Sequence, residues 1–187
     1  MIALECAREP EDGPMKTSVR LLVLLLLVAV AVGGLIWSGA YDIAADDPHW
    51  RLTEETLEMV RDRSIEARAS GVEVPDLANE SLVRAGAGNY DAMCERCHLE
   101  PGEQRSELSL GLNPAPPNLT KDRIDDPAEA FWVIKHGIKM TGMPAFGPTH
   151  DEATIWSMVS FLQKIDELTP EQKRALAQGG DEEAEHH

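Results

Sequence analysis

Two cysteines and a histidine form the densest group of chemically capable side chains in the sequence. They stand as Cys94, Cys97 and His98 in the pattern C-x-x-C-H. Two thiols at this spacing on a turn or helix end reach the two vinyl groups along one haem edge, and the histidine that follows is held beneath the iron. The pattern predicts covalent haem attachment through two thioether bonds. His98 is the expected proximal ligand, because a neutral imidazole binds iron through one ring nitrogen while the other needs an acceptor.

Zinc binding and dithiol redox chemistry are the two competing interpretations of a C-x-x-C pair. A zinc site usually needs a second pair of Cys or His ligands, and the remaining cysteine, Cys6, lies far upstream. A redox dithiol is expected near a βαβ pattern, which we do not find. Both interpretations therefore rank behind haem attachment, and we assign Cys6 no function.

A second motif, GMPAFG at residues 142–147, contains a thioether that suits the opposite face of the iron. Methionine opposite histidine is the axial pair of electron-transferring cytochromes c, in which the sulfur raises the reduction potential. Met140 competes with Met143 for this role. We choose Met143, because Pro144 holds the residue before it in an extended conformation and Gly142 allows close backbone approach to the cofactor.

The order of these motifs resembles a known family. A helix, C-x-x-C-H, a proline-rich loop, GMPAFG and a last amphipathic helix follow one another as in class I cytochromes c, and the resemblance covers about residues 80–168. It implies an all-α class I cytochrome c fold around one covalently bound haem c. It also implies that a proline carbonyl accepts the second N–H of the proximal histidine, for which Pro116 and Pro117 are both candidates.

Helical spacing and capping signals predict the elements around the motifs. A helix over residues 81–93 runs straight into Cys94, and residues 99–125 form a loop around the haem edge. The cap, N1 proline and N3 glutamate of residues 126–129 open a second helix that ends at Gly137. His136 and His150 stand at helix ends, where we expect surface or capping roles.

The last core helix follows a capping-box pattern at residues 149–152, beginning with Thr149. Four apolar residues share one face of that helix: Ile155, Met158, Val159 and Leu162. In the family resemblance, Trp156 and Phe161 match positions that pack on the first helix of the domain.

The first part of the chain predicts export. Residues 21–41 are almost wholly apolar, with Lys16 and Arg20 in front and acidic residues behind, so we expect a transmembrane anchor with residues 1–20 in the cytoplasm. Translation from Met15 and cleavage near Ala40, which would leave a soluble periplasmic protein, are the alternatives.

The remaining segments are appendages of the cytochrome domain. Residues 42–79 are predicted to be a helical spacer whose helix starts at Thr53 and stops at Gly71. It either packs on the cytochrome fold or merely holds it away from the membrane. Residues 169–187 are predicted to form a short helix to Ala177 and then an acidic flexible tail.

The net charge of −16 in 187 residues makes nucleic acid an unsuitable partner. A redox partner with a basic docking patch suits an acidic surface better. The prediction is therefore a monohaem electron carrier on the periplasmic side of the inner membrane, not an enzyme and without a small-molecule substrate. The alternatives are a dedicated cytochrome subunit of a dehydrogenase or terminal oxidase, and a haem-based gas sensor or peroxidase-like enzyme, which needs an open sixth position.

Overall fold

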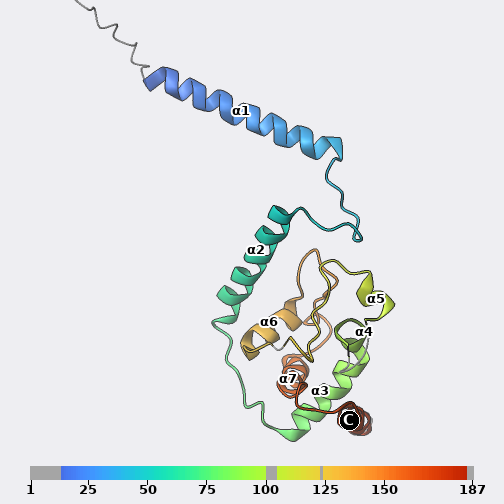
Figure 1. Ribbon diagram of the computed structural model, residues 1–187. Coiled ribbons are helices and arrows are strands. Elements are labelled where there is room, and N and C mark those ends of the chain that lie inside the picture. The colour runs from blue at the N-terminus through green and yellow to red at the C-terminus, as the bar shows by residue number, and fades with distance from the viewer. Residues whose placement is uncertain (1–13, 100–104, 123, 185–187) are drawn as a thin grey trace, which may run out of the picture. The chain divides into compact units, whose positions relative to one another are not determined.

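The computed structural model describes residues 14–99, 105–122 and 124–184, and every regular element within these ranges is a helix (Figure 1). The predicted all-α class is confirmed. The helices are α1 (Pro14–Ser38), α2 (Arg51–Ala69), α3 (Glu80–Met93), α4 (Glu95–His98), α5 (Glu107–Leu110), α6 (Pro127–His136), α7 (Glu152–Leu162) and α8 (Pro170–Ala184). Cys6 and the final three residues lie outside the described ranges.

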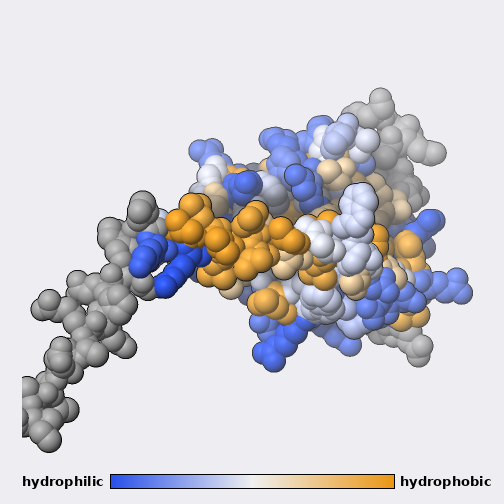
Figure 2. Space-filling model, turned by 90° about the horizontal axis from the view of Figure 1, so that it is seen from above, coloured by the Kyte–Doolittle hydropathy of each residue, from blue (hydrophilic) through white to orange (hydrophobic). Residues whose placement is uncertain are grey.

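The chain divides into two units, residues 1–44 and residues 45–187. Helix α1 belongs to the first unit. Its segment Lys16–Ser38 is long and apolar enough to cross a membrane, a property that anchors and signal sequences share. Figure 2 shows the hydrophobic side chains of α1 as a continuous surface. Helix α1 ends at Ser38, three residues before Tyr41, the last residue of the predicted transmembrane span.

The core of the second unit forms where α3 packs against α7 and α8. Gly86 permits the α3–α7 contact, since a Cβ atom there would lie 2.0 Å from the carbonyl oxygen of Ser157. Four residues along, the Tyr90 ring lies 5.4 Å from that of Phe161 in a tilted arrangement. The predicted crossing of the first and last core helices is therefore present, built on a small residue and an aromatic pair.

Trp156 occupies a different place from the one expected. Its ring stacks on Phe131 of α6, with centroids 4.2 Å apart and planes 15° apart, whereas Phe161 faces α3. Five positions along a helix correspond to a rotation of roughly 140°, so Trp156 and Phe161 point toward different neighbours. Trp156 therefore joins α7 to α6.

The predicted N-terminal cap is correct for α6, whereas the cap of α7 lies two residues after the predicted one. Asp126 caps α6, accepting hydrogen bonds from the backbone N–H of Ala128 at 2.8 Å and of Glu129 at 3.4 Å, and Gly137 ends the helix. The cap of α7 is Asp151, whose carboxylate accepts from Thr154 N–H at 2.8 Å. The expected cap Thr149 donates to the Phe146 carbonyl instead, so the helix begins two residues later than predicted.

The segments outside the predicted core helices contain α2, α5 and α8. Helix α2 packs on α6, which agrees with the first of the two alternatives given for the spacer. Helix α5 lies inside the predicted loop, with Ser106 as its side-chain cap. Helix α8 packs on α3 and continues to Ala184, which corrects the flexible tail expected after Ala177.

Candidate haem site

The C-x-x-C-H residues lie on one tight turn. Cys94 ends α3 and begins α4, and its carbonyl oxygen accepts hydrogen bonds from Cys97 N–H at 3.1 Å and His98 N–H at 2.9 Å. Both cysteines are half-buried free thiols. The last turn of α3 and the single turn of α4 therefore hold the two cysteines and the histidine on one short stretch of helix.

Burial, and secondarily the neighbouring Cys97, raises the pKa of Cys94 to about 12. The Cys94 thiol is therefore almost wholly protonated near neutral pH. Since the thiolate is the nucleophilic form, this protonation disfavours exchange with external disulfides while Cys94 is a free thiol.

The imidazole of His98 is oriented by the proline-rich loop. Nδ1 lies 3.0 Å from the carbonyl oxygen of Pro117, one of the two predicted candidates. A carbonyl only accepts hydrogen bonds, so Nδ1 carries the hydrogen and Nε2 presents its lone pair. Burial lowers the pKa of His98, an effect that the Pro117 hydrogen bond opposes. The neutral ring with a free Nε2 is the form that binds a metal.

Two contacts that the sequence did not reveal fix the segment after His98. Leu99 adopts φ = 70°, and its carbonyl oxygen accepts a 2.7 Å hydrogen bond from the buried hydroxyl of Tyr90. The hydroxyl of Ser106 donates to the carbonyl of Arg96 and so joins α5 to α4. The turn that holds the motif is thus tied both to α3 and to α5.

The two methionines of the GMPAFG region differ in burial. Met143 is half-buried and packs against the hydrophobic core, whereas Met140 has φ = 59° and is 84% exposed. The backbone N–H of Met143 donates to the hydroxyl of Thr141 at 3.1 Å, and its carbonyl oxygen accepts from Ile138 N–H at 3.2 Å. Met143 is thus held by its backbone with its side chain toward the core.

Glycines allow the loop at residues 137–147, here called the methionine loop, to lie close to its neighbours. Gly137 has φ = 64°, and a Cβ atom there would lie 2.7 Å from Ala145 N. A Cβ atom on Gly142 would lie 2.6 Å from Leu112 Cδ2. The loop is also bonded to the end of α6, because the N–H of Gly147 donates to the Lys135 carbonyl at 2.9 Å. These approaches bring the methionine loop against both α6 and the proline-rich loop.

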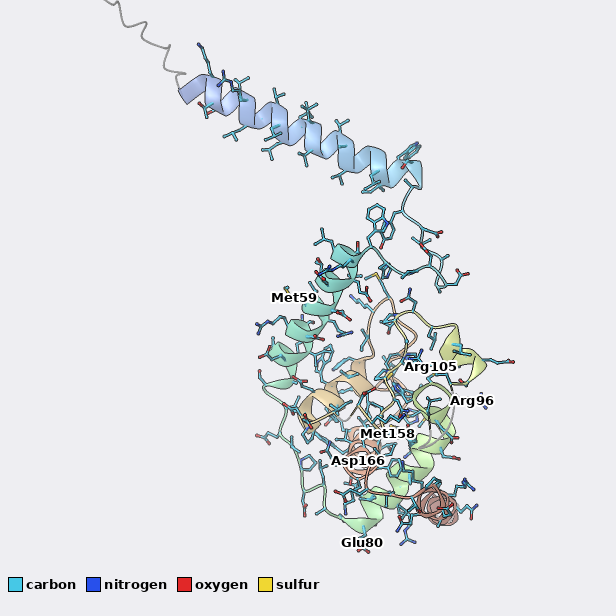
Figure 3. All side chains as sticks on the ribbon, viewed as in Figure 1. Met59, Glu80, Arg96, Arg105, Met158 and Asp166 are labelled. Carbon is cyan, nitrogen blue, oxygen red and sulfur yellow. The ribbon has the colours of Figure 1, made fainter. Side chains whose placement is uncertain are left out.

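His136 and His150 lie near helix ends, as expected. His136 is exposed and its ring lies 4.9 Å from that of Trp132. Nδ1 of His150 lies 2.9 Å from the hydroxyl of Thr149. In Figure 3, Arg96 and Arg105 lie beside α4 and α5, so positive side chains accompany the C-x-x-C-H turn.

Comparison with protein families identifies this arrangement. Residues 81–162 match the family model described as cytochrome C oxidase, cbb3-type, subunit III. The matched segment contains α3, both motifs and α7. Residues 81–162 are a c-type cytochrome domain. No curated protein matches the chain significantly.

A c-type cytochrome domain carries covalently bound haem c and serves electron transfer. The residues present fit this group: two free thiols and a neutral imidazole share one turn, and the imidazole has its outer nitrogen already hydrogen-bonded. A thioether faces the core from a loop that packs against the proline-rich segment. Among the described residues, no cluster of three His, Cys, Asp or Glu suits a separate metal ion.

Proposed function

We propose that Cys94 and Cys97 hold one haem c by thioether bonds and that His98 and Met143 are the axial ligands of its iron. The observation that carries this proposal is the His98 ring, whose Nδ1–H is committed to Pro117 at 3.0 Å and whose Nε2 is left as the ligating atom. The acceptor fixes the tautomer and the ring orientation. The half-buried side chain of Met143 supports its assignment to the other face.

The chain's own residues supply binding, orientation and exclusion of water. When bound, haem c supplies one-electron chemistry at its iron. Filled axial positions leave no place for a substrate, and a methionine ligand favours the reduced state relative to harder ligands. The protein on this proposal is an electron carrier and not an enzyme by itself, and its partners are other redox proteins.

The proposed location is the outer face of the inner membrane. Helix α1 has a 23-residue apolar segment with Lys16 and Arg20 at its start, which favours an anchor whose N-terminus is cytoplasmic. The cytochrome unit would then lie in the periplasm and exchange electrons there with respiratory or dehydrogenase partners. The strongly negative charge supports a partner with a basic docking patch.

Covalent attachment is the decisive test. The denatured full-length chain should keep its haem colour in a gel, and Cys94→Ala or Cys97→Ala should weaken this signal, with the double variant losing it. Cys6→Ala is the matched control and should leave the signal unchanged. Loss of all haem from the denatured wild-type chain would refute the proposal.

A second candidate function is a dedicated subunit of a terminal oxidase or dehydrogenase complex. The family description, which names an oxidase subunit, favours it. A stable complex recovered from native membranes in mild detergent would support this candidate, whereas a haem-loaded chain that purifies alone and exchanges electrons with several soluble cytochromes would support the independent carrier.

A further inference from the structure

The outer side of α2 carries apolar side chains that are open to solvent in the described structure. Leu52, Met59 and Val60 are 76%, 66% and 60% exposed. In Figure 3, Met59 projects from the side of α2 that is turned away from α6. Ile65 and Ala69, which are less exposed, lie on other sides of the same helix. Helix α2 therefore buries one side against the cytochrome core and presents a second apolar side outward.

Charge is distributed unevenly around α2. Six residues fall within an arc of roughly 100° at 3.6 residues per turn, and we call them the outer arc: Leu52, Thr56, Met59, Val60, Arg63 and Ala67. All the acidic residues of α2 lie outside this arc: Glu54, Glu55, Glu58, Asp62 and Glu66. The chain has a net charge of −16, yet this exposed surface is apolar, contains one arginine and lacks acidic residues. An exposed apolar surface of this kind indicates a site of interaction.

The short segment between α1 and α2 limits how far the outer arc can lie from the residues of α1. Residues 39–50 link the two helices and reach at most about 40 Å when fully extended, at ~3.4 Å per residue. The link is itself apolar in places, with Ile43 89% and Trp50 54% exposed. Tryptophan prefers the boundary between lipid and water. With α1 in a bilayer, the short link keeps the outer arc at a high effective concentration relative to the lipid surface.

We propose that the outer arc of α2 is a membrane-contact surface that binds phospholipid headgroups and orients the cytochrome unit. Leu52, Met59 and Val60 insert between headgroups, and Arg63, which is 78% exposed beside Glu66, lies near the phosphates. Four of the acidic residues, Glu54, Glu55, Glu58 and Asp62, then lie away from the anionic surface, and Glu66 at the edge of the arc is paired with Arg63. This inference rests on the proposed anchoring by α1.

A photo-crosslinker tests the contact directly. The haem-loaded full-length chain is reconstituted into vesicles of phosphatidylethanolamine and phosphatidylglycerol, with p-benzoylphenylalanine in place of Met59 or of its neighbour Glu58. The two positions stand at the same depth along α2 but on different sides. Position 59 is expected to yield several-fold more phospholipid adduct by mass spectrometry than position 58. Adding Val60→Glu should reduce the adduct at position 59, whereas Asp62→Glu should not.

Three outcomes separate this inference from the function on which it rests. Release of the wild-type chain from native membranes by alkaline carbonate would refute the anchor and with it the membrane contact. Retention of the chain with equal adducts at positions 58 and 59 would refute the contact alone. Protein adducts at position 59 in native membranes, without lipid adducts in vesicles, would show that a partner protein covers the outer arc.

Discussion

At the scale of single residues, the most informative contrast is between Met140 and Met143. The two side chains stand three positions apart, yet Met140 is 84% exposed and Met143 packs against the core. Met140 has a positive φ, while hydrogen bonds to Thr141 and Ile138 hold the backbone of Met143. Burial of the side chain and hydrogen bonds to the backbone both distinguish Met143, the proposed ligand, from the exposed Met140.

Met143→Ala should remove the near-infrared sulfur-to-iron charge-transfer band of the ferric protein and lower its reduction potential, because the iron loses its thioether ligand. Met140→Ala is the matched control and should leave both the band and the potential unchanged. Absorption spectra and redox titration of the purified proteins check this. Loss of the band in the Met140 variant alone would contradict the assignment and direct attention to His136, His150 or Lys139.

At the scale of elements, the α3–α7 crossing depends on the absence of a side chain at Gly86. A Cβ atom there would lie 2.0 Å from Ser157 O and 2.9 Å from Phe161 Cβ, and neither a helix backbone nor a buried Cβ yields easily. Gly86→Ala is expected to reduce the free energy of unfolding by about 1–3 kcal/mol or more.

Denaturant titration of the haem-loaded protein in detergent measures this change. Gly71→Ala is the control, since a Cβ atom there meets nothing within 4 Å. The control should be neutral or slightly stabilising, because alanine restricts the unfolded chain. Equal effects of Gly86→Ala and Gly71→Ala on the free energy of unfolding would show that α3 and α7 can move apart without loss of stability.

The contact between α2 and α6 contains several carboxylates. The pKa of Glu129 is raised by burial and, in order, by Asp126, Glu66 and Asp62. The folded state therefore holds the Glu129 proton more tightly than the unfolded chain does. This stabilising contribution is complete below the ordinary value of 4.5 and is lost as pH rises through the raised folded value.

Glu129→Gln should make the free energy of unfolding less dependent on pH just above 4.5 and should stabilise the protein slightly at neutral pH, by less than about 1 kcal/mol for a largely exposed group. Unfolding curves at a series of pH values measure the effect. Glu73→Gln, at an exposed position in the segment before α3, is the control. A Gln variant that is less stable than wild type at neutral pH would contradict the repulsion.

At the scale of the whole molecule, the net charge of −16 should govern encounters with small redox reagents. Oxidation of the reduced protein by anionic ferricyanide is expected to accelerate as salt is added, because screening weakens repulsion. Oxidation by the cationic tris(phenanthroline)cobalt(III) should slow down. Stopped-flow rates over a range of ionic strength test both. The opposite trends would show that local positive charge, such as Arg96 and Arg105, outweighs the total at the site of electron exchange.

The parts of the molecule that are local in sequence were the predictable ones. The C-x-x-C-H turn, the Asp126 cap and the Gly137 stop depend on neighbours within a few residues, and each has the predicted form. Two contacts between distant segments were not predictable from the sequence. The choice of Pro117 over Pro116 depends on how the loop folds back, and the stacking of Trp156 on Phe131 depends on the rotation of α7.

The appendages show the same division. Spacing predicted a helix in the spacer, but that α2 packs on α6 depends on a surface that only the folded core presents. Helix α5 is a single turn, too short for any periodicity to reveal, although its cap Ser106 is a recognisable signal. The haem ligands themselves remain predictions until the spectra described above are measured.

The position of α3 between α7 and α8 has a consequence for biogenesis. If the chain crosses the membrane in the order of synthesis, with its N-terminus kept in the cytoplasm as proposed, α3 and the cysteines emerge well before the two helices that bury α3. Until α7 and α8 emerge, Val83 and Ala87 of α3 lack the helices that bury them in the folded domain. On the proposed topology, the order of translocation leaves an interval before α3 is buried, in which the two thiols would be accessible to the machinery that joins them to haem. Once the C-terminal helices close over α3, that interval ends.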